Sequence, residues 1–141
     1  MTYIEEGDYI KIMQTMPVVC VDALIQNKKG EFLLVKRDNE PLKGKFWMPG
    51  GRLHKGETSA NGIIRKVKQE LGVNCRIIKC LGHFEEFFDK VAQVGDCSFH
   101  AVSIVFLIEL ESEDIELDSQ SSEWKWFKDL PPILRNYKFF N

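Results

Sequence analysis

The clearest pattern along the chain is a run of apolar residues at helical spacing near its middle. From Thr58 to Leu71 apolar residues recur every three or four positions, which predicts a helix with one packed side and one side free for chemistry. The apolar positions are Ala60, Ile63, Ile64, Val67 and Leu71, and the polar positions expected on the surface are Arg65, Lys66, Lys68, Gln69 and Glu70. Thr58 or Ser59 suits the N-cap, and Gly72 suits the left-handed residue that ends a helix.

Apolar runs on either side of this helix predict strands. Residues 18–25 and 31–37 are expected to form a hairpin, and the further strand segments are residues 75–81, 84–88, 101–108 and 123–127. The expected loops are residues 38–45, 89–98 and the acidic residues 111–118. A short helix should lie between Gly7 and Pro17, packed on its own domain or across a partner subunit. Strands on both sides of one strong helix favour a mixed α/β fold.

Composition narrows the class of protein. The 141 residues fit one domain, and 19 Lys+Arg against 21 Asp+Glu give a net charge of -2. Charge therefore directs the protein to neither nucleic acid nor a membrane surface, and we expect a small-molecule partner. The start of the chain has no targeting pattern, and no run approaches the ~20 apolar residues of a membrane span, so a cytoplasmic location is expected. The cysteines fit no zinc spacing and are expected to be buried free thiols: Cys20, Cys75, Cys80 and Cys97.

A tight turn precedes the central helix. Residues 47–51 read Trp-Met-Pro-Gly-Gly, and two adjacent glycines after a proline let backbone carbonyl and amide groups approach a ligand closely. We therefore expect a metal ion or a phosphate group where this turn meets the helix.

Asp22 places a charge in the first strand. Because a buried, unpaired carboxylate is unfavourable, it should have a cationic partner, for which Arg37 or Arg52 is the candidate. The alternative is an aspartate at a strand edge that faces water.

Residues 51–73 resemble the conserved box of the Nudix hydrolase family. The family pattern is Gly, five residues, Glu, seven residues, Arg-Glu-x-x-Glu-Glu, one residue and Gly. The residues that agree with it are Gly51, Glu57, Arg65, Val67, Glu70, Gly72 and Val73. Lys66 and Gln69 replace two of the metal-binding glutamates.

Within the family, the chain resembles the GDP-mannose mannosyl hydrolase subgroup, which keeps only the last glutamate of the run. The likeness extends through the first half of the chain, over residues 15–17, 30–34, 36–37, 46–47 and 49–52. It implies a Nudix fold, a mixed β-sheet sandwiched between α-helices, in a single domain of residues 1–141, and a homodimer. It also implies hydrolysis of a nucleotide sugar of the GDP-mannose type, with water attacking sugar C1 and a nucleoside diphosphate leaving.

The resemblance further implies a magnesium site, with manganese as the alternative ion. Glu70, the Gly50 carbonyl and Gln120 match ligand positions of the subgroup. Magnesium keeps several waters, so one carboxylate can suffice when substrate phosphates complete the shell. Alternatively, Lys66 and Glu70 form a surface pair worth about 0.3–0.5 kcal/mol, and the metal is weak or absent.

Two arginines match the positions that hold the diphosphate in the subgroup. Arg37 and Arg52 both lie beside the glycine turn, and Asp22 is assigned to substrate binding with them. Glu57 and Arg65 are expected to form an ion pair that fixes the loop. For Arg37 and Arg52, the alternative interpretation is that both are ordinary surface arginines.

The chain differs from the subgroup at the position of the general base. Ser121 stands where the subgroup has its catalytic histidine, and losing a positioned base lowers the rate by about 10²–10⁴-fold. Glu123, two residues along, is the expected replacement. The other candidates are Glu85, Glu86 and His100.

Two further functions stay open. A Nudix pyrophosphatase would cleave the P–O–P linkage of a nucleoside diphosphate derivative, although Lys66 and Gln69 count against it. A catalytically weak nucleotide-sugar-binding module would have kept the pocket and lost the base at Ser121.

Overall fold

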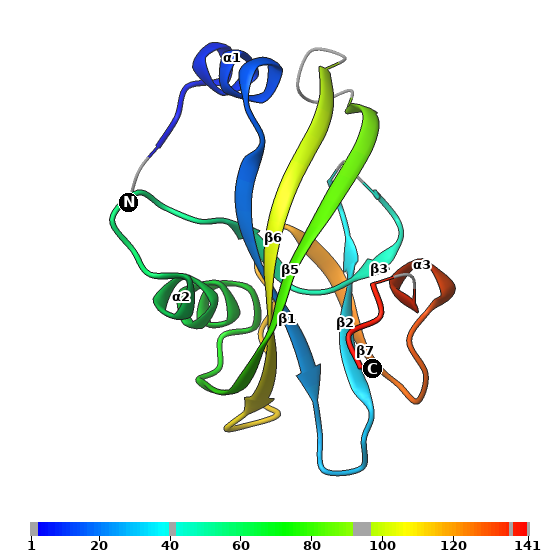
Figure 1. Cartoon of the computed structure of the whole chain (residues 1–141). Coiled ribbons are helices and arrows are strands. Elements are labelled where there is room, and N and C mark those ends of the chain that lie inside the picture. Colours follow the sequence, from blue (N-terminus) through cyan, green and yellow to red (C-terminus); the bar gives the residue numbers. More distant parts are fainter. Residues whose placement is uncertain (1–2, 40–41, 92–96, 136, 141) are drawn as a thin grey trace.

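The structure of the chain, a computed structural model, describes residues 3–39, 42–91, 97–135 and 137–140. Its elements in chain order are α1 (Glu6–Thr15), β1 (Val18–Gln26), β2 (Phe32–Arg37), β3 (Phe46–Trp47), β4 (Gly50–Arg52), α2 (Ser59–Leu71), β5 (Cys75–Val91), β6 (Cys97–Leu110), β7 (Ser121–Phe127) and α3 (Pro132–Arg135), as Figure 1 shows.

The strands of the described residues form one mixed seven-stranded sheet with β1 near its centre. β1 runs parallel to β6, from the Val18–Ala101 pair to the pair formed by Ile25 and Ile108. The C-terminal residues Ile25 and Gln26 of β1 pair antiparallel with β2. Residues 20–22 of β1 pair antiparallel with β4. The main order is β3-β2-β1-β6-β5, and β7 pairs with β2. The predicted hairpin of β1 and β2 is confirmed.

Helix α2 covers one face of the sheet. Ile63, Val67 and Leu71 are fully buried in the first core cluster, which they share with side chains of β1, β2 and β6. Burial of each such side chain stabilises the fold by about 1.5–3 kcal/mol. The Thr58 hydroxyl accepts a hydrogen bond from a backbone N–H three residues on (3.1 Å), and Gly72 ends the helix at φ 71°. The predicted helix and both of its caps are confirmed.

The opposite face of the sheet is covered by α3 and the segment after it. Leu134 and Phe139 pack on Leu24, Leu34 and Val105 in the second core cluster. Helices therefore lie on both faces of a mixed sheet (Figure 1), which confirms the predicted α/β architecture.

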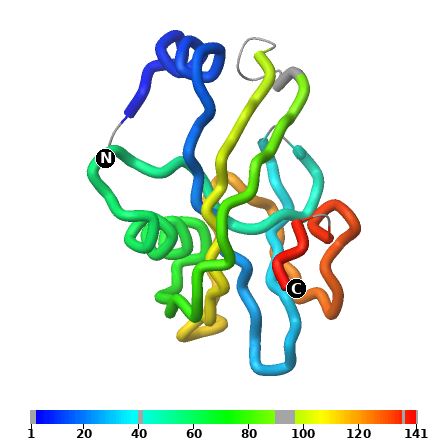
Figure 2. Tube along the Cα trace, viewed as in Figure 1, coloured from blue at the N-terminus to red at the C-terminus, as the bar shows by residue number. Residues whose placement is uncertain are grey.

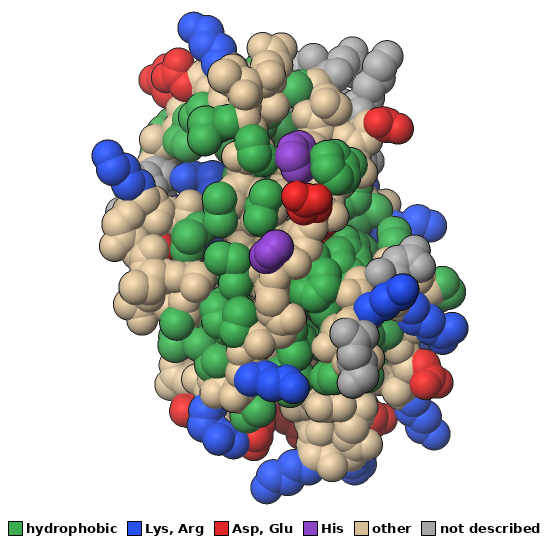
Figure 3. Space-filling view, viewed as in Figure 1, with side chains coloured by type: hydrophobic (Ala, Val, Ile, Leu, Met, Phe, Trp, Pro, Cys, Tyr) green, Lys and Arg blue, Asp and Glu red, His purple; other side chains and the backbone are tan. Residues whose placement is uncertain are grey.

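Strands β5 and β6 are longer than the sequence pattern predicted. The segments 75–81 and 84–88 belong to one strand, whose pairing with β6 shifts register near Gly82. The predicted loop at residues 89–98 was wrong at both ends, because β5 continues to Val91 and β6 begins at Cys97; residues 92–96 lie outside the described part. In Figure 3 apolar side chains run along the middle of the face over these strands.

The acidic residues 111–118 form a loop, as predicted, but they are tied to the end of α2. Ile115 and Leu117 pack against the first core cluster. The backbone N–H of Asp118 donates to the carbonyl of Glu70 (3.2 Å). The loop is therefore held close to the last turn of the helix.

Helix α1 confirms the predicted short helix near the start of the chain. Met13 packs with Val18, Cys20 and Ala101, so the helix packs on its own domain. The trace in Figure 2 shows α1 at the end of β1 that is farther from α2. The expected homodimer stays a prediction.

Two expectations from composition can be compared with the fold. The four cysteines are free, as predicted, but only Cys20 is buried and Cys80 is exposed. The helices of the described residues are all too short or too polar to cross a membrane.

Gly72 offers a test of the helix boundary. An alanine there would have to adopt the left-handed conformation, with its Cβ 3.2 Å from the Cβ of Glu116. We expect Gly72→Ala to lower the free energy of unfolding by about 1–2 kcal/mol in urea titrations. Gly7→Ala in α1, where nothing lies within 4 Å of the added carbon, is the control and should not destabilise. Equal midpoints for the two variants would contradict this account of the cap.

Candidate active site

The glycine turn approaches β1 more closely than any other residue type would allow. Asp22 on β1 pairs with Gly50 on β4. A Cβ built on Gly50 would lie 2.0 Å from Oδ1 of Asp22 and 2.4 Å from the backbone oxygen of Val21. Glycine at this position is therefore what allows the turn to lie directly over the buried aspartate.

Asp22 is 6% exposed, which excludes the interpretation that it faces water. The hydroxyl of Ser103 on β6 donates a hydrogen bond to Oδ2. Burial raises the pKa of Asp22 to about 6, while the Ser103 hydrogen bond and the charges of Arg37 and Lys66 oppose the rise. Of the two predicted cationic partners, Arg37 therefore acts on Asp22. Burial raises the pKa values of Cys20 and Tyr9, and the charge of Arg52 opposes both rises.

Glu70 is the least exposed acidic residue in the described part of the chain, at 2% exposed. Its Oε2 atom has no hydrogen-bond partner among the described residues, and the side chain accepts a hydrogen bond from the Gly50 N–H. Burial raises its pKa to about 7, with Asp118 and Asp22 adding to the rise and Lys66 opposing it. A buried carboxylate oxygen without a hydrogen-bond partner is available as a ligand for a cation.

The alternative of a surface pair between Lys66 and Glu70 is wrong, because both residues are buried. Lys66 is 7% exposed, and its side chain reaches over the glycine turn towards Gly51. The helical pattern assigned both residues to the solvent side because they are charged. In the fold, β4 and residues 111–118 cover this side of α2, so two charged residues point into the protein.

The predicted ion pair between Glu57 and Arg65 is confirmed. Nη2 of Arg65 lies 2.6 Å from Oε1 of Glu57, and Nε lies 3.0 Å from Oε2. The same guanidinium donates to the backbone carbonyl of Arg52 (3.2 Å), and Glu57 also accepts from the His54 N–H (2.8 Å). The hydrogen bonds from Arg65 hold the pKa of Glu57 down at about 2. These contacts fasten the loop between β4 and α2 to the helix.

A pocket of about 630 Å³ opens where the turn, α2 and the acidic loop meet. Its lining includes Gly51, Arg52, Lys66, Asp118 and Gln120. Of the predicted site residues, Arg52 and Gln120 are therefore brought together at this pocket. Asp22, Glu70 and Arg37 form a deeper group, linked to the pocket through Lys66, whose charge acts on both carboxyl groups.

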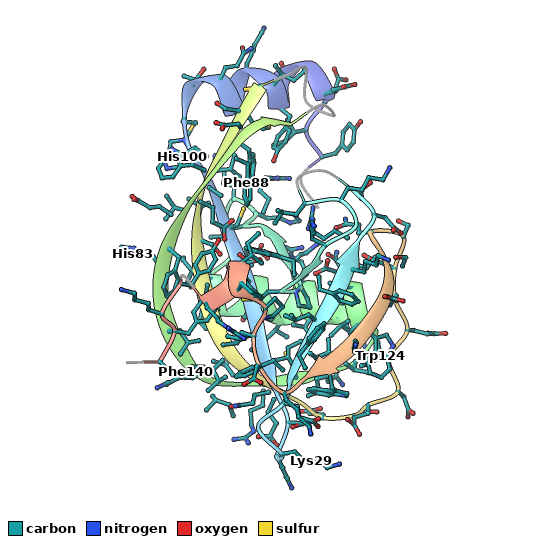
Figure 4. The ribbon with its side chains drawn as sticks, turned by 90° about the vertical axis from the view of Figure 1, so that its right-hand side faces the viewer. Lys29, His83, Phe88, His100, Trp124 and Phe140 are labelled. Atoms are coloured by element: carbon teal, nitrogen blue, oxygen red, sulfur yellow. The ribbon has the colours of Figure 1, made fainter. Side chains whose placement is uncertain are left out.

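The candidate bases lie in different surroundings. Glu123 is exposed on β7, opposite Lys36, and Ser121 is buried opposite Arg37. Glu85 is exposed on β5. Figure 4 shows His100 well apart from Trp124 of β7. The His100 ring stacks on Phe87 at 4.3 Å between ring centroids.

Glu86 is the buried member of these candidates. It is 7% exposed, and its Oε1 atom has no hydrogen-bond partner among the described residues. The Tyr137 hydroxyl donates a hydrogen bond to its side chain. Burial raises the pKa of Glu86 to about 8, and the nearby Asp22 adds to the rise.

Sequence reasoning missed Ser103 and Tyr137, which contact these two carboxyl groups. Ser103 was detectable in principle, because it is a polar residue within an apolar strand. Tyr137 lies in a short C-terminal segment with no pattern of its own, and its contact with β5 depends on the tertiary fold.

The residues around Glu70 could hold a divalent ion. No group of three or more His, Cys, Asp or Glu side chains that could hold a metal occurs among the described residues. Glu70 offers a free oxygen, and the backbone of Gly50 lies beside it. Magnesium takes few protein ligands when water and phosphate oxygens supply the rest.

Several known proteins are similar to this chain. The NUDIX domain model matches residues 16–128. The chain is 36% identical over 131 residues to the low-salt glycan biosynthesis protein Agl8 of Haloferax volcanii, covering 93% of this chain and 82% of that protein. It is 32% identical over 111 residues to an ADP-ribose pyrophosphatase of Methanocaldococcus jannaschii, covering 79% of this chain and 62% of that protein.

A solved structure shows the same fold. The MutT protein from Methanosarcina mazei Go1 superposes with a TM-score of 0.66 at 26% identity, covering 89% of this chain and 83% of that one. The family match spans most of the chain and includes the glycine turn, the Glu57–Arg65 pair and Glu70. The chain therefore belongs to the Nudix hydrolase family.

Proposed function

We propose that this chain is a magnesium-dependent hydrolase of a nucleotide sugar, of the GDP-mannose type, that releases a nucleoside diphosphate. The observation that carries the proposal is the buried carboxylate of Glu70, whose Oε2 atom has no hydrogen-bond partner among the described residues and which lies near the Lys66 ammonium. Such a site suits one ion and a negatively charged leaving group. The similarity to a glycan biosynthesis protein supports a nucleotide-sugar substrate.

The reaction exchanges one bond at the sugar carbon. The water oxygen bonds to C1, and the bond from C1 to the β-phosphate oxygen breaks. The electron pair of that bond leaves with the nucleoside diphosphate, and the base takes the proton of the water. Arg37 and Arg52 are proposed to hold the diphosphate, because a guanidinium donates two hydrogen bonds to phosphate oxygens in a fixed geometry.

The metal ion would be held by Glu70, the Gly50 carbonyl and Gln120. When bound, it would neutralise charge that develops on the leaving diphosphate. Glu57 and Arg65 keep the loop in place, and Asp22, fixed by Ser103, is proposed to take part in binding the substrate.

Glu123 is proposed as the general base. It lies on the strand that begins at Ser121, close in sequence to Gln120 of the pocket. Glu86 is the second candidate, favoured by its unpartnered oxygen. A base must be ionised, however, and a pKa of about 8 keeps Glu86 largely protonated near pH 7.

One specific observation favours the alternative of a pyrophosphatase that cleaves the P–O–P linkage. The relative from Methanocaldococcus jannaschii bears the name of such an enzyme. Against it, Lys66 and Gln69 supply no carboxylate, and pyrophosphate cleavage with several metal ions needs more oxygen ligands than Glu70 alone. A binding module without activity would leave the pocket intact and give no product.

Isotope labelling separates the two reactions. Hydrolysis of GDP-mannose in water enriched in oxygen-18 should place the label in the free sugar and none in GDP, because the attack occurs at carbon. Mass spectrometry of both products provides the measurement, and a reaction without enzyme is the control. Label in a phosphate, with GMP and sugar 1-phosphate as products, would establish the pyrophosphatase instead.

The pH dependence of the rate identifies the base. Glu123→Gln should lower kcat by about 10²–10⁴-fold. Glu86→Gln should leave most of the activity near pH 7, where the Glu86 carboxyl group is protonated. If Glu86 were the base, wild-type kcat/KM would rise as the pH increases through about 8, because ionisation creates the base, and Glu86→Gln would remove that rise. This second pattern would contradict the assignment of Glu123.

A further inference from the structure

Lys66 is a buried lysine that the proposed reaction does not yet use. It lies on α2 and is 7% exposed. A Cβ built on Gly51 would lie 2.8 Å from Cε and 3.1 Å from Nζ of Lys66. The end of the side chain therefore packs directly on the backbone of the glycine turn, and the missing side chain of Gly51 leaves space for it.

The Lys66 ammonium group has unused hydrogen-bonding capacity. Neither ion pair within 4.0 Å in the described part of the chain includes it, and no hydrogen bond from Nζ occurs there. Its charge acts at longer range on Glu70, Asp22 and Cys20. An ammonium carries three N–H donors, and a buried charge without direct partners is unfavourable. A ligand with oxygen acceptors would satisfy these donors.

The position of Lys66 defines the side from which such a ligand arrives. The residue lines the 630 Å³ pocket together with Gly51, Arg52 and Gln120. Arg65 also borders the pocket, but its guanidinium is already bonded to Glu57. Lys66 therefore adds a buried positive charge to this side of the pocket, which favours an anion beside it, although Asp118 also lines the pocket.

We propose that the Lys66 ammonium binds a phosphate oxygen of the diphosphate and takes the place of a second divalent ion. A fixed positive charge beside Glu70 repels a further cation, since like charges a few ångströms apart interact unfavourably in a partly buried site. The site then holds one divalent ion per bound diphosphate. The inference rests on the proposed function in one respect, that the ligand carries a diphosphate. It does not depend on which sugar is bound or on which bond is cleaved.

Binding of inorganic pyrophosphate tests the first half of the proposal independently of catalysis. In calorimetric titrations with manganese present, Lys66→Met should weaken pyrophosphate binding by roughly 10–100-fold, the range for hydrogen bonds to charged groups. Lys68→Met, on the exposed side of the same helix, is the control and should change the affinity less than about twofold. Unchanged affinity in Lys66→Met, with circular dichroism like that of the wild type, would overturn the phosphate contact.

The number of bound manganese ions tests the second half. Electron paramagnetic resonance of the wild-type protein saturated with pyrophosphate should count one ion per chain. Lys66→Glu, which exchanges the ammonium for a carboxylate, should bind a second ion. Two ions in the wild type would overturn the proposal, whether or not the variants fold.

If Lys66→Met fails to fold, Lys66→Gln keeps a polar end of similar length and should show the same loss of pyrophosphate affinity. Retained pyrophosphate affinity in a folded Lys66→Gln protein would count against the contact. These outcomes are distinct from a failure of the proposed reaction, because a site with one ion and a lysine contact could still belong to an enzyme that cleaves between phosphorus atoms.

Discussion

The site depends on how closely the Gly50–Gly51 backbone approaches β1 on one side and α2 on the other. At Gly50 a single methyl group would collide with Asp22, and at Gly51 it would meet the end of Lys66. This approach removes Asp22, Glu70 and Lys66 from water. Burying an ionised group is unfavourable by several kcal/mol even after the protein relaxes, and the positive charge of Lys66 opposes this effect at both carboxyl groups.

The surrounding elements hold the turn in this place. β4 pairs with β1, and the ion pair between Glu57 and Arg65 fastens the loop that follows to α2. The acidic loop is bonded to the last turn of the same helix through Asp118 and Glu70. Each of these contacts holds the backbone around the site in position and does not itself bind the substrate. Together they leave a carboxylate oxygen and an ammonium group with few partners at the edge of a pocket, where a cation and an anion can satisfy them.

Local features of the sequence predicted local features of the structure. The spacing of Ile63, Val67 and Leu71 identified the packed side of α2, and Thr58 and Gly72 marked its ends correctly. The ion pair of Glu57 and Arg65 followed from the family resemblance. The continuous strand β5 was not predicted, because Gly82 interrupts its apolar pattern while the chain continues through an irregular register.

Contacts between distant segments were beyond sequence reasoning. A helical pattern divides residues into apolar and polar sides, so it placed Lys66 and Glu70 in water, whereas β4 and the acidic loop cover them. The hydrogen bond from Ser103 to Asp22 joins residues 81 positions apart, and Tyr137 reaches Glu86 from the end of the chain. The network around the carboxyl groups is therefore a property of the tertiary fold.

The most direct test of this account measures manganese affinity in Glu70→Gln, with no substrate turnover involved. Glutamine keeps the shape of the side chain and removes its charge. The account predicts that the affinity falls by at least the roughly 10–100-fold that changes to outer-shell partners of a metal cause, while the unfolding transition remains cooperative. Manganese affinity equal to that of the wild type would contradict it, because the Glu70 carboxylate would then not be what holds the ion.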